Sequence, residues 1–364
     1  MLFNLDKHVS LSKLHCKSTG YFRNMQYLCG KIEKKMRIVG LGNALMDVLL
    51  QLKQEEILSE IGIQKGAMDM INREQMIAIR QRLADCPRTQ APGGSVCNTM
   101  RALAYLGAEA GFIGKIGTDA IGEYYEEALR KAHVHPHFIR TTGESGSCTV
   151  MISPDGERTM GTFLGPAPTI EPDEISEELL RDYHIIYIEG YLIVNEPLVR
   201  TTMEKAKRLG LKVALDLSNF NIVNGFKPLL EDLIPRYVDI LFSNESEAAA
   251  YTGLPAEEAV LELAKQVEVA VVTIGKEGSL VAAGGKRYAI PAEGGKPIDT
   301  TGAGDNFAAG FLYGQSLGAS WAQSARIGST LSGYVIEVVG PQIADAKWPE
   351  IKEKVNALLN KTRI

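Results

Sequence analysis

The sequence predicts an α/β fold, a three-layer αβα sandwich in which helices cover both faces of a central, mostly parallel sheet. The first observation is a rhythm: from residue 36 onward, short runs rich in Val, Ile and Leu alternate with longer segments of helical period, as in repeated βαβ units. The second is that two stretches, about residues 48–71 and 144–165, break this rhythm. We expect these two stretches to pair into a small β-sheet lid.

Each predicted strand is a short apolar run, which suits a parallel sheet that is buried on both faces. The predicted strands are residues 37–40, 110–114, 184–188, 212–216, 239–243 and 269–274. The predicted helices are residues 95–106, 122–133, 197–209, 256–267, about 303–317 and 346–364. Residues 36–345 then form the main domain, followed by the C-terminal helix.

The stretch 144–165 is expected to contain a hairpin. Pro154, Asp155 and Gly156 lie between two runs of β-prone residues, and a Pro-Asp-Gly sequence favours a tight turn. A lid built from such a hairpin excludes water from the site that it covers, which protects a reactive group from hydrolysis.

Composition is typical of a soluble globular protein. The chain has 364 residues, of which 45% are hydrophobic and 23% charged, with a formal net charge of −5. Neither nucleic acid nor membrane is therefore an expected partner, and no apolar run approaches the roughly 18 residues of a membrane span. The five cysteines are widely spaced without a Cys-x-x-Cys pair, which argues against a disulfide framework or a zinc ribbon and favours the cytoplasm.

Residues 1–35 form an extension that is basic and has no periodic pattern. A transit peptide is one interpretation, but Asp6, Glu33 and the modest serine content count against it. The interpretation we favour is a start codon assigned too early, so that the folded chain begins near Met36.

The most informative motif is residues 299–310, in which small residues open a predicted helix. The amides of Gly302, Ala303 and Gly304 would present unpaired N–H groups and the positive end of the helix dipole to an anion. Asp305 falls in the first helical turn. Taken alone, an Asp at that position is usually explained as a complement to the helix dipole, so the rest of the sequence decides its role.

The sequence resembles the PfkB or ribokinase family of carbohydrate and nucleoside kinases over nearly the whole chain after residue 36. Two family signatures carry the resemblance, and they occur in the right order. One is residues 299–310, and the other is residues 93–99 followed by Gly107 and residues 112–117. The resemblance implies a ribokinase-like sheet with a lid and an ATP-dependent phosphotransferase activity.

The resemblance also implies roles for the residues of the glycine-rich motif. Asp305 matches the catalytic base, which accepts the proton of the acceptor hydroxyl. Gly302, Ala303 and Gly304 match the anion hole that meets the charge on the transferred group. Phosphoryl transfer requires mainly positioning and electrostatic stabilisation from a protein, and these residue types supply both.

On the nucleotide side, Asn244 and Glu247 follow a predicted strand. They match family positions beside the phosphates and a water-coordinated Mg²⁺, and Asn244 also suits a plain helix N-cap. Asp299 and Thr301 fall where some relatives bind a monovalent cation such as K⁺. The positions that match the nucleotide-lining loop and helix are Thr273, Gly275, Gly278 and Ser329. Gly278 suits a plain turn equally well, and Ser329 stands where adenosine kinases tend to carry a larger ring-bearing residue.

On the acceptor side, the resemblance matches Asn43 and Asp47 to the polar pair that holds acceptor hydroxyls. Asp47 lies in an otherwise apolar run, where a carboxylate is costly without partners, so its own context favours a functional role. The remaining matches are Gly93, Gly94, Asn98 and Arg158. For Arg158, directly after a predicted turn, the alternative is a solvated hairpin residue.

Several alternatives remain open at this stage. Within the family the sequence is most similar to adenosine kinases, and a sugar kinase acting on ribose, fructose or a keto-deoxy sugar acid is the competitor. A nucleoside-binding protein without catalysis and an NAD-dependent dehydrogenase are weaker candidates, the latter suggested by residues 40–45. His133, His135 and His137 are interpreted as an exposed connection rather than a zinc site. Both a monomer and a homodimer are compatible with the sequence.

Overall fold

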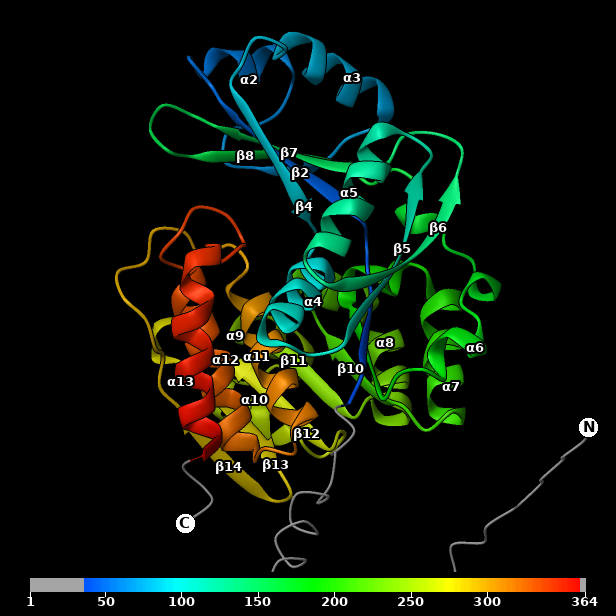
Figure 1. Ribbon diagram of the computed structural model, residues 1–364, viewed down its shortest axis with the longest axis vertical. Helices are drawn as coiled ribbons and strands as arrows, with labels where there is room; N and C mark the ends of the chain where they lie inside the picture. The colour runs from blue at the N-terminus through cyan, green and yellow to red at the C-terminus, as the bar shows by residue number, and fades with distance from the viewer. Residues whose placement is uncertain (1–35, 361–364) are drawn as a thin grey trace, which may run out of the picture. The chain divides into compact units, whose positions relative to one another are not determined.

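The computed structural model describes residues 36–360, which contain a nine-stranded main sheet (Figure 1). Its order is β14-β13-β12-β11-β10-β9-β1-β5-β6, and only the β12–β13 and β13–β14 pairs are antiparallel. The strands are β1 (Ile38–Leu41), β5 (Ala110–Gly117), β6 (Val134–Thr141), β9 (Ile185–Glu189), β10 (Lys212–Asp216), β11 (Ile240–Asn244), β12 (Val269–Thr273), β13 (Ser279–Ala283) and β14 (Lys286–Ile290). The predicted α/β class with a mostly parallel sheet is confirmed.

Helices cover both faces of the main sheet. They are α4 (Ser95–Leu106), α5 (Ala120–Lys131), α6 (Glu177–Leu180), α7 (Glu196–Arg208), α8 (Phe220–Tyr237), α9 (Glu245–Thr252), α10 (Ala256–Leu263), α11 (Ala303–Ser316), α12 (Trp321–Val335) and α13 (Trp348–Asn360). One apolar core includes α4, α5, α11, α12 and α13, and a second includes α6 to α10. In β9, Ile185 and Tyr187 face the first core, whereas Ile186 and Ile188 face the second. This two-sided burial explains why the strand sequences are apolar throughout.

The two irregular stretches form a second, smaller sheet of order β3-β8-β7-β2-β4. Its strands are β2 (Leu45–Gln51), β3 (Met68–Met70), β4 (Arg88–Gly93), β7 (Gly146–Ile152) and β8 (Arg158–Phe163). Helix α2 (Glu56–Glu60) lies between β2 and β3, and α3 (Arg73–Arg82) lies between β3 and β4. The antiparallel β7–β8 pair turns through Gly156 at a φ of 88°, which confirms the predicted hairpin. The first stretch is longer than residues 48–71, since β4 belongs to it. The exposed, polar start of β4 gave no strand pattern.

Residues 133–137 are not the exposed connection that we expected. His133 has a left-handed φ of 60°, and the residues after it form β6, which pairs with β5 at the edge of the main sheet. Pro136 is tolerated there because an edge strand has one side without ladder partners. Within residues 36–360, no group of three or more His, Cys, Asp or Glu side chains is placed to hold a metal ion.

The helices α8, α9 and α12 were not among the expected elements, and the other differences are small. Helix α5 begins and ends two residues earlier than predicted, and α10 ends at Leu263. The antiparallel β13–β14 pair was not predicted, because its second strand is mostly exposed and lacks an apolar run. The predicted C-terminal helix corresponds to α13, and residues 1–35 and 361–364 lie outside the described part of the chain. No helix in that part is long and apolar enough to cross a membrane.

Candidate active site

Five neighbouring parallel strands each bring one polar residue to the same edge of the main sheet. Because carboxyl ends of parallel strands meet at one edge, ligands of open α/β sheets bind there. The five residues are Asn43 just after β1, Glu189 at the end of β9, Asp216 at the end of β10, Asn244 at the end of β11 and Thr273 at the end of β12. Sequence reasoning identified Asn43, Asn244 and Thr273. It missed Glu189 and Asp216, although each is an acidic residue that ends a predicted strand or follows it directly.

The glycine-rich motif forms the start of α11. Gly302 is the N-cap residue with a left-handed φ of 76°, and a Cβ there would lie 2.6 Å from the Pro341 side chain, so only glycine fits. The N–H of Ala303 donates to the Thr300 carbonyl at 3.2 Å, while Gly304 lies in the first turn, where helical geometry supplies no partner. Of the three predicted anion-hole residues, Gly304 is the one that lines both the 370 Å³ and the 260 Å³ cavities, and Gly302 lines neither.

Asp305 lies in the first turn of α11 and is held by the first turn of α4. The Ser95 hydroxyl donates to Oδ1 at 2.7 Å and the Asn98 amide donates to Oδ2 at 2.9 Å. Burial raises the pKa of Asp305, and these two hydrogen bonds to its charged form oppose that rise. Both carboxylate oxygens thus have fixed directions. Ser95 was not singled out in the sequence, because a serine at the start of a helix is ordinarily a capping residue.

A cavity of about 370 Å³ brings residues from both predicted halves of the site together. A second cavity of about 260 Å³ shares Thr273, Gly304 and Phe307 with it, and a third of about 230 Å³ shares Asp47, Gly94 and Ser95. The predicted residues that line the first are Asp47, Gly94, Asn98, Arg158, Asn244, Glu247, Thr273, Thr301, Gly304 and Asp305. Those that line the second are Thr273, Gly275, Gly278, Ala303, Gly304 and Ser329. Asp305 therefore borders a space with one further cavity on each side.

The third cavity is mostly apolar, with polar groups from two predicted acceptor residues. Asn43 is held there by Glu189, whose Oε1 accepts a hydrogen bond from the Asn43 backbone N–H at 2.8 Å and a second from its side-chain amide. Glu189 is buried, and this burial raises its pKa to about 7. The apolar lining residues are Leu45, Met70, Cys148, Leu164, Pro168, Leu192, Val194 and Ile222.

Asp47 projects from β2 of the small sheet toward Asp305. Burial first, and then the charge of Asp305, raises the pKa of Asp47 to about 7. Gly93, paired with Leu45 across the sheet, makes room for it, since a Cβ on Gly93 would lie 2.2 Å from the Asp47 carboxylate. Gly94 has a φ of 90° and a Cβ there would lie 2.6 Å from the Asn43 carbonyl oxygen. The two glycines are therefore required by the close approach of acceptor-side residues.

Asn244 and Glu247 form a capping box at the start of α9. The Asn244 side chain accepts from the Glu247 N–H at 2.9 Å, and the Glu247 carboxylate accepts from the Asn244 N–H at 2.9 Å and its amide at 2.7 Å. The N-cap interpretation is thus correct for Asn244, and both residues still line the 370 Å³ cavity. Burial, followed by the charge of Asp216, raises the pKa of Glu247. Burial, followed by the charge of Asp305, raises that of Asp216.

Arg158 reaches from β8 to the loop before α11. Its Nη1 lies 2.8 Å from Asp299 Oδ2 and 3.2 Å from Thr301 Oγ1. Asp299 also accepts from the Gly340 N–H at 2.6 Å and from the Thr301 N–H and hydroxyl at 3.1 and 2.8 Å. Arg158 is therefore not a solvated hairpin residue. The Asp299 carboxylate is surrounded by donors, so the arrangement does not present it as a free ligand for K⁺.

The remaining predicted nucleotide-side residues have structural partners of their own. Ser329 donates to the Pro291 carbonyl at 2.8 Å and accepts from the Glu293 N–H at 3.0 Å, so its hydroxyl joins α12 to the loop after β14. Gly275 and Gly278 have φ values of 54° and 103°, and a Cβ on Gly278 would lie 2.0 Å from the Ile290 carbonyl oxygen. The plain-turn interpretation of Gly278 therefore holds alongside its place in the cavity wall.

Comparisons with known proteins agree with this geometry. The family model described as pfkB family carbohydrate kinase matches residues 68–348, well over half of the chain. The adenosine kinase of Schizophyllum commune is 27% identical over 344 residues, which cover 86% of this chain and 97% of that protein.

Two solved structures show the same fold. The adenosine kinase from Sinorhizobium meliloti has a TM-score of 0.79 and 30% identity, covering 88% of this chain and 99% of that one. A probable sugar kinase from Rhizobium etli CFN 42 also has a TM-score of 0.79, with 28% identity over 89% of this chain and 99% of its own. The chain therefore belongs to the pfkB family of carbohydrate kinases, and it is a phosphotransferase with a ribokinase-like fold.

Proposed function

We propose that this kinase transfers the γ-phosphoryl group of ATP to a hydroxyl of an adenosine-like nucleoside, with Asp305 as general base. The observation that carries the proposal is the position of Asp305. It borders the 370 Å³ cavity, which has a glycine-lined cavity on one side and a mostly apolar cavity on the other. This order suits a nucleotide, a reaction centre and an acceptor in succession, as transfer of a phosphoryl group between two bound substrates requires.

In the proposed reaction, the acceptor oxygen attacks the γ-phosphorus while the bond from that phosphorus to the β,γ-bridging oxygen breaks. The proton of the hydroxyl passes to Asp305, and ADP leaves. Ser95 and Asn98 fix the two oxygens of Asp305, so the base needs no reorientation during the reaction. The Gly304 amide at the start of α11 stabilises charge that develops on the transferred group.

The apolar character of the third cavity supports a nucleoside as the acceptor. A flat nucleobase buries apolar surface against side chains such as Leu164, Pro168 and Ile222, whereas a free sugar exposes hydroxyls that such walls leave unpaired. Asn43 and Asp47 also line this cavity and offer polar groups for the ribose hydroxyls, and Asp47 lines the Asp305 cavity as well. One observation favours a sugar kinase instead: the buried carboxylate of Glu189 also lines this cavity and is a group that sugar hydroxyls bind.

Asp216 and Glu247 suit a hydrated Mg²⁺. Both line the same cavity, and burial and nearby negative charge raise the pKa of each carboxyl group. A divalent cation bound through water would supply the missing positive charge. When bound, Mg²⁺ neutralises the phosphate oxygens of the nucleotide. We include no monovalent cation in the proposal, because donors surround the Asp299 carboxylate.

We also propose that residues 36–345 form the catalytic domain and that residues 1–35 are dispensable for it. A chain beginning at Met36 should match the full chain in kcat and KM. A large loss of activity on truncation would contradict this proposal.

A coupled assay of ADP release tests the function directly, with ATP, Mg²⁺ and adenosine, ribose, fructose or a keto-deoxy sugar acid as acceptor. We expect turnover with adenosine and a nearly inactive Asp305→Asn variant. Turnover with a sugar but not with adenosine would replace the nucleoside proposal by the sugar kinase. Binding of adenosine without turnover would indicate a binding protein.

A further inference from the structure

The far wall of the apolar cavity is built from a segment with unusual backbone contacts. This segment, which we call the wall, comprises residues 164–170 and includes the short helix η1 (Ala167–Thr169). Its residues Leu164 and Pro168 line the third cavity but not the one that contains Asp305. The wall therefore contacts the part of an acceptor that lies away from the reacting hydroxyl.

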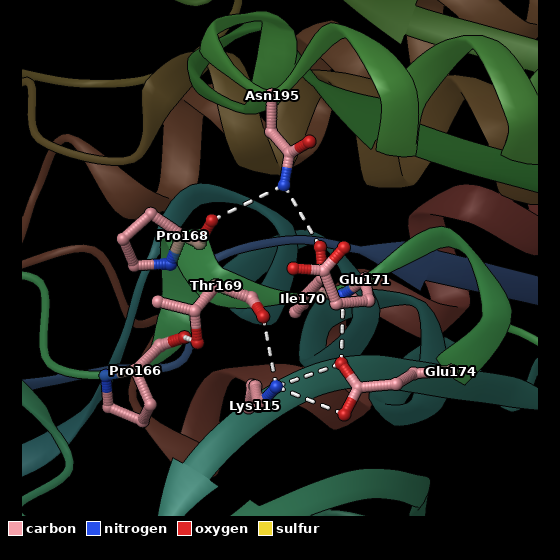
Figure 2. Close-up of polar contacts among 8 residues, drawn as sticks. All are labelled: Lys115, Pro166, Pro168, Thr169, Ile170, Glu171, Glu174 and Asn195. Carbon is pink, nitrogen blue, oxygen red and sulfur yellow. Dashed lines mark hydrogen bonds and ion pairs between the residues drawn. The ribbon is translucent and has the colours of Figure 1, made fainter.

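Three consecutive backbone carbonyls of the wall accept hydrogen bonds from side chains that are distant in sequence (Figure 2). The Asn195 amide donates to the carbonyls of Pro168 at 3.3 Å and Ile170 at 2.9 Å, and Lys115 Nζ donates to that of Thr169 at 2.9 Å. Backbone carbonyls outside helices and strands are paired with other backbone groups, with side chains or with ordered water. Here two side chains fix all three.

Lys115 is a costly residue to place at this position. It lies on β5 in the interior of the main sheet and is only 8% exposed, and a buried ammonium group requires compensation. Glu174, in the short helix η2 (Pro172–Glu174), lies 2.8 Å from Lys115 Nζ. Both Glu174 oxygens bind this ammonium group, as Figure 2 shows. The lysine thus ties the wall and the segment after it to strand β5 of the main sheet.

The Asn195 side chain makes two kinds of hydrogen bond. It is the N-cap residue of α7, where its Oδ1 accepts from the Leu198 N–H at 3.2 Å. Its amide donates to the wall, and the residue itself lines the third cavity beside Pro168. The start of α7 and the wall are therefore held in register by one side chain at the edge of the cavity.

We propose that Lys115 and Asn195 are positioning residues that set the acceptor specificity of this kinase, by fixing the wall at the distance that fits a flat nucleobase. The proposal rests on the proposed function and deepens it. Loosening the wall should weaken contacts with the base while leaving the reaction centre and the nucleotide side intact. Affinity for a nucleoside should then fall more than affinity for free ribose, which is too small to reach the wall.

Two variants test the wall and a third serves as a matched control. Lys115→Met keeps the length of the side chain and removes the ammonium group. Asn195→Ser keeps an N-cap oxygen for α7 and removes the amide that holds the wall. The control is Lys205→Met: Lys205 on α7 donates to the Pro172 and Ile175 carbonyls at 2.8 Å each, outside the cavity lining. It removes similar lysine-to-carbonyl bonds just beyond the wall.

The measurements are adenosine binding by calorimetry and steady-state kinetics with adenosine and with ribose. For Lys115→Met and Asn195→Ser we expect the Kd and KM for adenosine to rise about tenfold, the loss expected for one misplaced apolar contact. The KM for ATP and kcat should stay within about twofold of wild type, and the preference for adenosine over ribose should fall about tenfold. Lys205→Met should change none of these values.

The outcomes separate the two proposals. If wild type neither binds nor phosphorylates adenosine, the proposed function fails, and with it the nucleobase role of the wall. If wild type uses adenosine but neither wall variant changes its Kd, or Lys205→Met changes it equally, the wall proposal alone is overturned. Should Lys115→Met fail to fold, Asn195→Ser decides, because its helix cap is retained.

Discussion

The catalytic end and the acceptor end of the site are built in different ways. At the catalytic end, Asp305 and its glycines belong to one continuous motif at the start of α11, and α4 supplies Ser95 and Asn98. At the acceptor end, the third cavity takes residues from strands of both sheets, from α4 and α8, and from several separate connections. A motif that is local in sequence fixes the chemistry, whereas dispersed side chains shape the acceptor space.

This difference leads to a ranked set of expectations. Changes at the catalytic end should lower kcat for every acceptor. Changes at the acceptor end should raise the KM of the acceptor and leave the nucleotide side unaffected.

The largest effect is expected for Asp305→Asn. Loss of the general base should lower kcat by about 10²–10⁴-fold, while adenosine and ATP still bind because the two cavities on either side are unchanged. Single-turnover kinetics measures the rate of phosphoryl transfer, and calorimetry measures the binding of adenosine and ATP separately. A variant that retained wild-type kcat would show that Asp305 is not the base.

Asn43→Ala should act at the acceptor end. It removes an amide from the third cavity and leaves the buried Glu189 carboxylate without one of its donors, so the KM for adenosine should rise about 10–100-fold. The KM for ATP should be unchanged and serves as the internal control. An equal rise in the KM for adenosine and the KM for ATP would contradict a role of Asn43 at the acceptor end alone.

Ser95→Ala should shift a pH profile. The Ser95 hydroxyl lowers the pKa of Asp305 against the effect of burial, so its removal should raise that pKa. The acidic limb of the kcat/KM profile then moves to higher pH. On that limb, kcat/KM of Ser95→Ala should be about tenfold below that of wild type, and at alkaline pH the two proteins should have the same kcat/KM.

A buried serine in the last turn of α11 gives the control for this profile. Ser316→Ala removes a hydroxyl that bonds only locally, to the Tyr313 carbonyl, and should leave the profile unchanged. Coincident profiles for wild type and Ser95→Ala would mean that the hydroxyl does not tune the base.

The smallest effect concerns stability and pH. The folded-state pKa of Glu189 is about 7, above its ordinary value of 4.5, so the folded protein retains a proton that the unfolded chain releases. Glu189 therefore lowers stability as pH rises from about 4.5 through 7. Glu189→Gln lacks this titration. The free energy of unfolding of the variant minus that of wild type should therefore be larger at pH 8 than at pH 5, by on the order of 1–3 kcal/mol. Urea unfolding at both pH values measures the difference, and a parallel pH dependence for the two proteins would contradict it.

The sequence allowed accurate predictions where a structural rule acts locally. Buried parallel strands such as β9 and β12 are apolar on both faces, so their positions could be predicted within a residue or two. Gly302 and Asp305 could be placed at a helix start because small residues precede an apolar helix there. The β7–β8 hairpin followed from its Pro-Asp-Gly turn.

Features that depend on partners far away in the sequence could not be predicted. Glu189 and Asp216 end strands, but only the fold shows that their carboxylates line the cavities. The exposed, polar start of β4 has no pattern that distinguishes a strand from a loop. Lys115 belongs to a family signature, yet its contact with Thr169 and Glu174 depends on how the connection after β8 folds back.

A competition between adenosine and D-ribose for ATP in one mixture, with both phosphorylated products quantified by mass spectrometry, most directly tests phosphoryl transfer to a nucleoside with Asp305 as the base. The apolar acceptor cavity predicts that kcat/KM for adenosine exceeds that for ribose by at least about 10²-fold, the discrimination that loss of base contacts provides. Loss of the general base in Asp305→Asn should lower the rate of formation of both products by about 10²–10⁴-fold. A ratio near or below one would contradict a nucleoside acceptor, and undiminished product from Asp305→Asn would contradict its role as the base.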